Sequence, residues 1–428
     1  MTSSAVPQTL PDSMFALILA LLLLAPLAIA GVALLNTGLG RSRSAAQSLL
    51  GCVTIIAVSA IAFAVVGVAF AGNPSHIIVG AGKPWNWLGA APLLLRNFNA
   101  AVPQTQIAVL FEFIAVAFAA IIPWGSGADR WRLPAGCIST AFLAAVVFPL
   151  LAHWTWGGGW LAQLGANFGL GDGFLDAGGA ATVHALGGLS ALAVVWIAGS
   201  RKGKFPKEGL ATALPGHNAV YILFGCLLAL IGWMAWNVAG AIFWLHAPPG
   251  TLVVVVINTL LSASTALVAT FTVTRTRFGK PDASMCANGW MAGLVASSAC
   301  AALVTPLEAI VVGGIAGIAT PLLVELLELA LSIDDPSGAI TVHACGGLWG
   351  LFAAGVFAPR QGQLMAQLVG IATLLGLIFP LVYLLSALLN RLLPFRVDPD
   401  GERLGMDLHE LGGGAYPEFV IHRDESYR

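Results

Sequence analysis

Two histidines occupy matching places in two copies of one polar pattern. The first copy runs from Asp176 to His184, and the second runs from Asp335 to His343, about 160 residues later. In each copy the Asp stands eight residues before the His, Thr-Val precedes the His, and a Gly-Gly-Leu run begins three residues after it. An ionisable side chain within apolar, membrane-embedded sequence raises the free energy by about 3 kcal/mol, so a repeated one indicates function. The pattern marks His184 and His343 as the candidate centre of a transport path.

Two facing imidazoles offer a specific chemistry. A neutral ring donates a hydrogen bond from one nitrogen and accepts one at the other, so two rings can bond each other and still present polar edges to a small guest. A dry site disfavours the charged imidazolium, which favours neutral rings or one shared proton. A metal ion would need a third and a fourth ligand, and only Glu112 is expected at a similar depth. We therefore predict no metal site.

Each aspartate in the pattern has a structural role available to it. At the start of a helix, Asp176 can accept hydrogen bonds from the free N–H groups of Gly178 and Gly179. Asp335 can do the same near Ser337 and Gly338. The alternative for Asp176 is direct contact with an arriving cation, because this residue is expected at the outer face. The capping role is the preferred interpretation for both.

The composition is that of a protein that crosses a membrane many times. Of 428 residues, 58% are hydrophobic and only 9% are charged, with a mean hydropathy of +0.88; a soluble domain carries about 25% charged residues. The formal net charge of -1 gives no electrostatic reason to expect nucleic acid as a partner. The six cysteines lack CxxC spacing, so we interpret them as packing residues rather than disulfides or metal ligands.

The elements that must position the histidines are membrane helices. Apolar runs of about 20 residues separated by polar or Gly/Pro breaks predict eleven of them. The first is interpreted as a helix rather than a cleaved signal peptide, because the residues before it include Asp12 and no Lys or Arg. The predicted spans are residues 14–36, 46–71, 104–124, 134–152, 178–199, 218–245, 251–273, 284–303, 307–331, 338–358 and 364–391.

Basic residues set the expected orientation. With the N-terminus outside, eleven Lys and Arg residues fall in inner loops and three in outer loops, as the positive-inside rule requires. The inner ones are Arg41, Arg43, Arg130, Arg132, Arg201, Lys202, Lys204, Lys207, Arg275, Arg277 and Lys280, and the outer ones are Lys83, Arg96 and Arg360. An odd number of spans then leaves the C-terminus in the cytoplasm.

This topology turns the repeated pattern into an inverted repeat. Asp176 begins the fifth span from the outside and Asp335 begins the tenth from the inside, so two halves of five helices run in opposite directions. We predict an all-α membrane fold of one domain over residues 1–392, followed by a cytoplasmic tail over residues 393–428. Its parts are the repeats at residues 14–199 and 218–358 and a bracing eleventh helix at residues 364–391.

At this point the sequence resembles a known family, the ammonium transporters (Amt/Mep/Rh), over nearly its whole length. The resemblance rests on the paired Asp-x7-His stretches and on several shorter motifs. These motifs are Asp334-Asp335-Pro336, His153 followed by Trp156-Gly157-Gly158-Gly159, Gly232-Trp233 before Asn237, Thr305-Pro306, and Gly405-Met406-Asp407-Leu408-His409-Glu410.

The resemblance implies a function. It implies a homotrimer in the inner (plasma) membrane, surrounded by lipid, with one hydrophobic pore per subunit lined by His184 and His343. Ammonium would be recruited outside, lose its proton and cross as ammonia, without a cofactor and without an enzymatic reaction. The order is physically reasonable, because a bare cation is expensive to desolvate and neutral ammonia is not. A P-II type regulator could dock on Arg201 to Lys207 and the tail.

The resemblance also assigns roles at the outer end of the pore. Trp156 matches a vestibule tryptophan whose ring face attracts the cation, although a plain interfacial role is the alternative. Phe111, Trp236 and Glu112 would complete the recruitment site; a carboxyl satisfied at a subunit interface is the alternative for Glu112. Asp176 is included there through the direct contact described above.

Three positions depart from the family pattern at the outer end. The family's serine falls at Gly240, and its two stacked phenylalanines fall at Ala115 and Trp236. A large Trp236 opposite a small Ala115 could conserve the volume of the gate, with Phe118 one turn away filling the remainder. A rebuilt gate leaves two alternatives to transport open: an ammonium sensor with little flux, and a conduit for another small neutral gas or amine.

Overall fold

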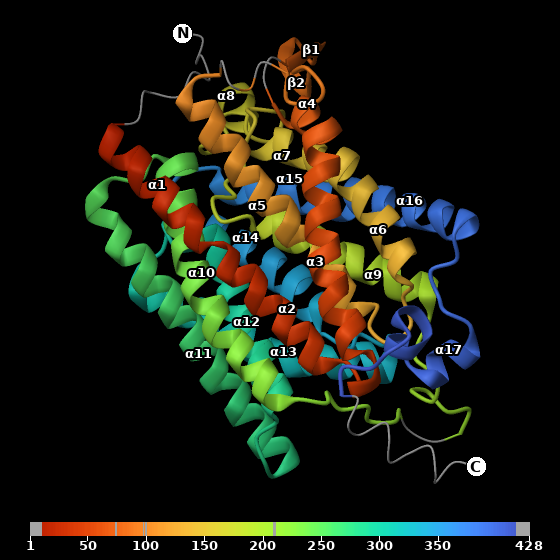
Figure 1. Ribbon diagram of the computed structural model, residues 1–428. Coiled ribbons are helices and arrows are strands. Elements are labelled where there is room, and N and C mark those ends of the chain that lie inside the picture. The colour runs from red at the N-terminus through yellow and green to blue at the C-terminus, as the bar shows by residue number, and fades with distance from the viewer. Residues whose placement is uncertain (1–10, 73–74, 97, 99–100, 209–210, 417–428) are drawn as a thin grey trace, which may run out of the picture.

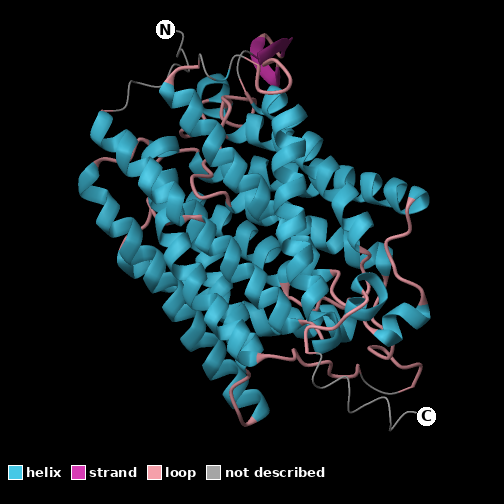
Figure 2. Cartoon of the chain, viewed as in Figure 1, coloured by secondary structure: helices cyan, strands magenta, loops and turns pink. Residues whose placement is uncertain are grey.

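The structure is a computed structural model that describes residues 11–72, 75–96, 98, 101–208 and 211–416. It is a bundle of long helices with one short β-hairpin at the end of the bundle where α1 (Asp12–Leu24) begins (Figures 1 and 2). The short helix α17 (Pro399–Leu404) lies at the opposite end. The first ten residues of the predicted membrane domain and the tail beyond residue 416 lie outside the described part of the chain.

Except for the short helices α8 and α17, the helices occupy the ranges where spans are predicted, and several spans are interrupted by wider π-helical turns. In the first half they are α1, α2 (Pro26–Leu39), α3 (Ala45–Ala62), α4 (Val68–Ala71), α5 (Pro103–Ser126), α6 (Leu133–Phe142), α7 (Phe148–Thr155), α8 (Leu164–Phe168) and α9 (Leu186–Ala198). In the second half they are α10 (Ala219–Leu245), α11 (Leu252–Phe278), α12 (Ala283–Cys300), α13 (Pro306–Glu325), α14 (Gly346–Phe357), α15 (Gln363–Thr373), α16 (Phe379–Leu392) and α17.

Over the described residues, ten helical stretches are long and apolar enough to cross a membrane. All eleven predicted ranges are helical, and α12 is the one that does not meet this criterion. It carries Asn288 and several Gly and Ser residues, so its composition is more polar. It is nonetheless enclosed, because α10, α11, α13 and α14 all pack against it. Polarity of this kind is tolerated when a helix faces protein rather than lipid.

Predicted and observed boundaries differ most at the end of α11. The helix continues to Phe278, five residues beyond the predicted end, and closes on Gly279 in the left-handed conformation (φ +77°). Its last turn carries Arg275 and Arg277, which were expected in a loop. Basic residues interact favourably with the C-terminal end of the helix dipole, so charge here extends the helix instead of ending it.

The segment between α4 and α5 contains a β-hairpin that lies outside the predicted helical spans. Strands β1 (Ser75–Gly80) and β2 (Lys83–Gly89) pair antiparallel around a two-residue turn. Both turn residues, Ala81 and Gly82, have positive φ (50° and 71°), as tight hairpin turns require. Trp87 in β2 stacks on Trp160, so the hairpin is docked on the loop after α7.

The spans that carry the candidate residues are the most enclosed. In the spans at residues 103–126, 180–198 and 340–357, between 67% and 83% of the most apolar window is buried, against 28% for the spans at residues 42–71 and 363–392. Glycines permit close helix contacts, as at Gly232 on α10, where a Cβ atom would lie 2.1 Å from the backbone nitrogen of Ala28. Close approach of this kind replaces the hydrophobic effect as the basis of helix packing in lipid.

Candidate functional site

His184 and His343 meet inside the bundle. Their Nδ1 atoms are 3.3 Å apart, and their ring centroids are 5.3 Å apart at 28°. His184 is fully buried and His343 is 5% exposed. A bond between two Nδ1 atoms requires a proton on one and a lone pair on the other, so the two rings share one proton between them. With both rings neutral, one Nε2 then accepts and the other donates.

The two copies of the sequence pattern adopt the same local backbone. Gly179 (φ +74°) and Gly338 (φ +69°) are both left-handed, a conformation that other residues rarely adopt. A wide π-helical turn follows in each copy, over Ala180–Ala185 and Ile340–Cys345. Such turns project a side chain away from the position that a regular helix would give it. The histidine lies inside this turn in both copies.

Both aspartates accept hydrogen bonds at the start of the helix that follows, and the partners of Asp176 differ from the two glycines expected. Asp176 accepts from the N–H groups of Ala181 and Thr182, at 3.0 and 2.9 Å, rather than from the two glycines. Asp335 accepts from the N–H of Ile340 at 2.8 Å and from the Ser126 hydroxyl at 2.6 Å. The left-handed glycine delays the helix start by about one turn, so the free N–H groups lie further along the chain.

Glycines from each copy let the two helices cross at the histidines. A Cβ atom on Gly188 in α9 would lie 2.2 Å from the backbone nitrogen of Ala344. A Cβ atom on Gly347 in α14 would lie 2.6 Å from the carbonyl oxygen of Ala180. Each helix therefore presses a glycine against the π-helical turn of the other, and this reciprocal contact brings the imidazoles together.

Trp233, which the sequence analysis did not include among the site residues, covers the other face of His184. Its ring stacks on the imidazole at 4.8 Å and 15°, and its indole Nε1 donates to the Ser298 hydroxyl at 2.8 Å. Phe118 meets His184 edge-on at 5.0 Å. The sequence signal was the Gly-Trp pair on α10, which was used only as a family motif.

The gate differs from the predicted arrangement. Trp236 stacks on Phe111, with centroids 3.9 Å apart at 27°, and its indole Nε1 donates to the Gly178 carbonyl at 2.9 Å. Ala115 is fully buried, and its side chain is a single methyl group that cannot stack on Trp236. Phe118 lies deeper, against His184. The aromatic partner of Trp236 is thus Phe111, one turn before Ala115 on the same face of α5.

Two further tryptophans complete an aromatic cluster, which we define as Phe111, Trp156, Trp236 and Trp244. Trp156 stacks on Trp244 at 5.4 Å and 6°, meets Phe111 edge-on at 5.3 Å, and donates to the Asp176 carbonyl at 2.7 Å. The indole nitrogen of Trp244 is buried without a partner among the described residues. Trp244 was missed, although it lies eight residues after Trp236 and therefore on the same helix face.

Gly240 lies midway between Trp236 and Trp244 on α10, and close packing explains why this residue is small. A Cβ atom there would lie 2.1 Å from the Ala177 carbonyl oxygen. The absence of the family's serine is therefore tied to a closer approach of α10 to the segment that precedes His184. A serine would need the backbone at Ala177 to shift.

Glu112 follows Phe111 but is enclosed by its own chain. The residue is 5% exposed and makes no hydrogen bond or ion pair with any residue that the structure describes. It is therefore already buried in the single subunit. No group of three or more His, Cys, Asp or Glu side chains over the described ranges is placed to hold a metal ion.

A small cavity adjoins His343 on the side away from the aromatic cluster. It measures about 230 Å³ including its opening, and is lined by Val32, Leu35, Asn36, Asn288, Met291, Ser337, Ala339, Val342 and His343. The Asn288 amide oxygen is buried without a partner in the described part of the chain. The pair therefore has polar space beside His343 and packed aromatic rings beside His184.

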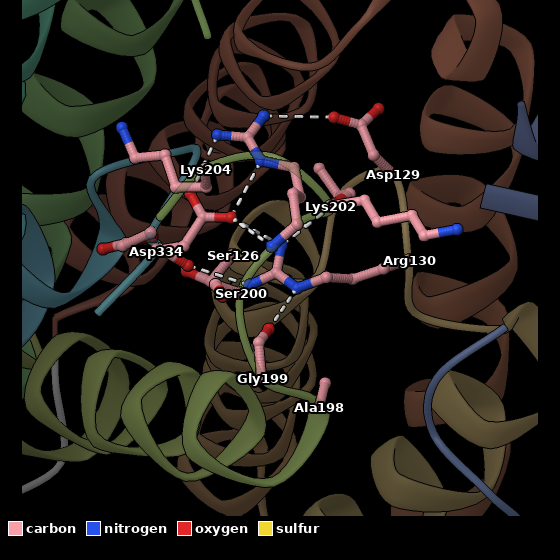
Figure 3. A network of polar contacts seen from close by, with 12 residues as sticks. Ser126, Asp129, Arg130, Ala198, Gly199, Ser200, Lys202, Lys204 and Asp334 are labelled. Carbon is pink, nitrogen blue, oxygen red and sulfur yellow. Dashed lines mark hydrogen bonds and ion pairs between the residues drawn. The ribbon is translucent and has the colours of Figure 1, made fainter. Parts of the chain in front are cut away.

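A charged network fixes the start of the segment that carries His343. We define it as Asp129, Arg130, Arg201 and Asp334, all at most 3% exposed (Figure 3). Arg201 binds Asp334 with two nitrogens at 2.9 Å and Asp129 at 3.1 Å. Arg130 donates to the carbonyls of Gly199 and Asp334, at 2.7 and 2.8 Å. The network ties the loops after α5 and α9 to the residue beside Asp335.

Charges in this network adjust one another's protonation. Burial opposes ionisation of Asp334, but hydrogen bonds from Arg201 and the positive charges of Arg130 and Arg201 outweigh it and lower the pKa of Asp334 to about 2. Burial lowers the pKa of Arg130 to about 10, against the attraction of Asp334. Both groups are therefore charged at neutral pH, and the network is held together by ion pairs.

These features together define a multi-pass membrane transport protein with a polar pair at the centre of its most enclosed helices. The family model "Ammonium Transporter Family" matches residues 14–416. The chain therefore belongs to the ammonium transporter family.

Individual relatives and solved structures agree with this assignment. "Ammonium transporter Amt2" of Archaeoglobus fulgidus is 34% identical over 422 residues, covering 92% of this chain and 86% of that protein. An ammonium transporter of Bacillus subtilis is 29% identical, covering 91% and 94%. Among solved structures, a "Sensor Amt Protein" superposes with a TM-score of 0.85 at 26% identity, covering 93% and 98%. Candida albicans Mep2 superposes at 0.78 with 25% identity, covering 95% and 91%.

Proposed function

We propose that this protein moves ammonium nitrogen across a membrane as ammonia, through a pore whose centre is the pair of His184 and His343. The observation that carries the proposal is the contact of the two Nδ1 atoms at 3.3 Å in a buried position. One shared proton leaves an accepting Nε2 on one ring and a donating Nε2 on the other. Ammonia both donates and accepts, so it can bond to either ring in passing, whereas an ion would have to enter without its water.

The aromatic cluster is the proposed recruitment site and gate. Ring faces of Trp and Phe attract cations, and Trp156, 9% exposed, is the most accessible of the predicted cluster members. Phe111 and Trp236 close the path below it, so ammonium loses its hydration shell and its proton before ammonia passes. Glu112 lies next to Phe111 and offers carboxyl oxygens that can accept hydrogen bonds from ammonium near this point. Asp176 acts by capping the His184 segment, since its carboxylate is occupied by Ala181 and Thr182.

The full topology is part of the proposal. Eleven helices cross the membrane, with α12 as the one beyond the ten apolar stretches. They form two inverted halves of five, and the bracing eleventh span is the continuous helix that contains α15 and α16. The N-terminus faces outside and residues 393–428 face the cytoplasm. The distribution of basic residues supports this orientation, and so do the opposite positions of α1 and α17 in the bundle (Figure 1).

Membership of the ammonium transporter family supports a proposal for the assembly and its surroundings. We propose a homotrimer in the inner (plasma) membrane, in contact with lipid. A P-II type regulator would dock on the cytoplasmic face formed by Arg201 to Lys207 and the tail. Ammonium is the proposed substrate, and no enzymatic step is part of the mechanism.

The test is a current measurement on a solid-supported membrane. Purified protein in liposomes receives an ammonium pulse, and wild type is compared with the double variant His184→Ala, His343→Ala. The matched control is His76→Ala, which removes an exposed histidine on β1. We expect a current that saturates with ammonium in wild type and in the control and is altered in the double variant.

Other outcomes separate the alternatives. Alkalinisation of the vesicles without a current would replace charge-coupled transport by conduction of neutral ammonia. Binding of ammonium with neither current nor alkalinisation would contradict transport and leave a sensor. Equal uptake of methylamine and ammonium with an unchanged double variant would indicate a different conduit, one that does not use the histidines.

A further inference from the structure

A cavity separate from the histidine pair lies between α5, α6, α9 and α16. It measures about 450 Å³ including its mouth, and we call it the Trp131 cavity. Its walls are mostly apolar, but they include Trp131, Ser139, Thr140 and Ser386. Trp131 lies in the loop between α5 and α6, at the end of the bundle that holds α17, and forms the end of the cavity on that side.

Several polar groups of this cavity lack partners, although the Ser190 hydroxyl bonds to the Leu186 carbonyl. The indole nitrogen of Trp131, which is 3% exposed, and the Ser139 hydroxyl are buried without a hydrogen bond among the described residues. Over the same residues, no hydrogen bond is made by the hydroxyls of Thr140 and Ser386.

Hydroxyls elsewhere in the bundle behave differently. Those of Thr54, Thr259 and Thr320 bond to the carbonyl four residues earlier, as is usual in membrane helices. A buried donor left unpaired destabilises a protein by about 1–3 kcal/mol. Two buried unpaired donors at one cavity, Trp131 and Ser139, therefore indicate an occupant that accepts hydrogen bonds.

The position of the cavity indicates what that occupant is. Its mouth is bordered by Phe142, which is 41% exposed on the membrane face of α6. Trp131 lies just beyond the predicted apolar spans, at the interfacial level where tryptophans donate to lipid carbonyl groups. Phe142, Val147 and Leu389 give the cavity an apolar wall, which suits a hydrocarbon chain.

We propose that the Trp131 cavity binds one acyl chain of a glycerophospholipid from the cytoplasmic leaflet, with the ester carbonyl accepting from the Trp131 indole nitrogen. The apolar chain then runs along Phe142 and the α16 wall, and the hydroxyls of Ser139 and Ser386 face the ester region or its water. The site is independent of the pore chemistry.

The site would also connect lipid to the tail. Trp131 packs against Phe395 at 5.5 Å between ring centroids, and the N–H of Arg132 donates to the Phe395 carbonyl at 2.9 Å. A lipid that orders Trp131 therefore stabilises the segment that joins α16 to α17. Ser190 of α9, the helix that follows His184, lies on the opposite wall.

The experiment compares two lipids that differ only at the ester. Dioleoyl phosphatidylglycerol and its diether analogue, which has no carbonyl oxygen, are titrated onto the full-length protein and the bound lipid is counted by native mass spectrometry. Loss of one hydrogen bond corresponds to about a five-fold change in affinity. We expect the first molecule of dioleoyl phosphatidylglycerol to bind wild type about five-fold more tightly than the first molecule of the diether analogue.

Variants assign this preference to the cavity. Trp131→Phe keeps the ring and removes the donor, so it should abolish the preference; Ser139→Ala should reduce it. The control is Thr54→Val, which removes a hydroxyl from the exposed face of α3 and should leave the preference intact. Equal affinity of wild type for both lipids, or a preference that survives Trp131→Phe, would overturn the proposal. So would an experimental map showing only water at these two donors.

Discussion

The two imidazoles differ in what surrounds them, although their sequence contexts are copies. His184 is packed between Trp233 and His343, while His343 adjoins a polar cavity. Their meeting follows from the repeated pattern, so the sequence predicts it. The sequence does not predict their different neighbours, because Trp233 and Asn288 come from helices outside the pattern. Only the packing of the bundle brings these two residues to the site.

Gly240 provides a test at the scale of one atom. Gly240→Ser restores the family's residue but places a Cβ atom 2.1 Å from the Ala177 carbonyl oxygen. Overpacking of this kind destabilises by about 1–3 kcal/mol, so we expect a lower melting temperature in detergent and a smaller ammonium current. Gly376→Ser is the control, because no heavy atom lies within 4 Å of its Cβ position. A stable, more active Gly240→Ser protein would contradict the packing explanation.

Arg201 tests the charged network. Arg201→Met keeps most of the side-chain volume and leaves Asp129 and Asp334 without their closest partner. Breaking a buried ion pair costs about 3–5 kcal/mol, so we expect a large fall in melting temperature. Arg391→Met removes an exposed charge near the end of α16 and should have little effect. Similar melting temperatures for both variants would show that the network contributes no stability.

The pKa of Asp334 predicts how this network responds to acid. The group titrates at about 2 in the folded protein, against an ordinary value of 3.8. Its contribution to stability is therefore complete above pH 4 and is lost as the pH falls toward 2. We expect the melting temperature of wild type to fall more steeply over this interval than that of Asp334→Asn. Parallel curves for the two proteins would contradict the lowered pKa.

At the scale of elements, the crossing of α9 and α14 depends on Gly188 and Gly347. Gly188→Ala introduces a Cβ atom 2.2 Å from a backbone nitrogen, so the helices must separate and the contact of the two Nδ1 atoms must lengthen. We expect a stability loss of about 1–3 kcal/mol, measured by thermal melting, together with reduced ammonia flux. Gly314→Ala in α13, where nothing lies within 4 Å, should be neutral or slightly stabilising. Normal ammonia flux in Gly188→Ala would show that transport does not depend on the close crossing of α9 and α14.

The helices themselves could be predicted, since each apolar run is long enough to identify itself. The hairpin could not, because Pro84 and two tryptophans in its second strand give no clear alternation. The sequence named three members of the aromatic cluster but not Trp244, and it did not predict that Phe111 stacks on Trp236 and Trp156 on Trp244. Spacing along one helix shows which residues share a face, but not which face meets which.

At the scale of the whole molecule, the proposed orientation can be tested by labelling. In a protein whose native cysteines are replaced, Ser13→Cys at the start of α1 and Arg403→Cys in α17 are both exposed. We expect an impermeant maleimide to label position 13 in intact cells and position 403 only after permeabilisation. The reverse pattern would invert the topology, and labelling of both in intact cells would exclude an odd number of crossings.

The stacked contact of Phe111 and Trp236 has a kinetic consequence for the proposed route. The rings lie 3.9 Å apart and are essentially buried, so nothing passes until they rotate. Turnover is then limited by a conformational step and not by how often ammonium arrives. Such a step has a large activation enthalpy, so transport should slow steeply on cooling, while a permanently open channel would follow the weak temperature dependence of diffusion.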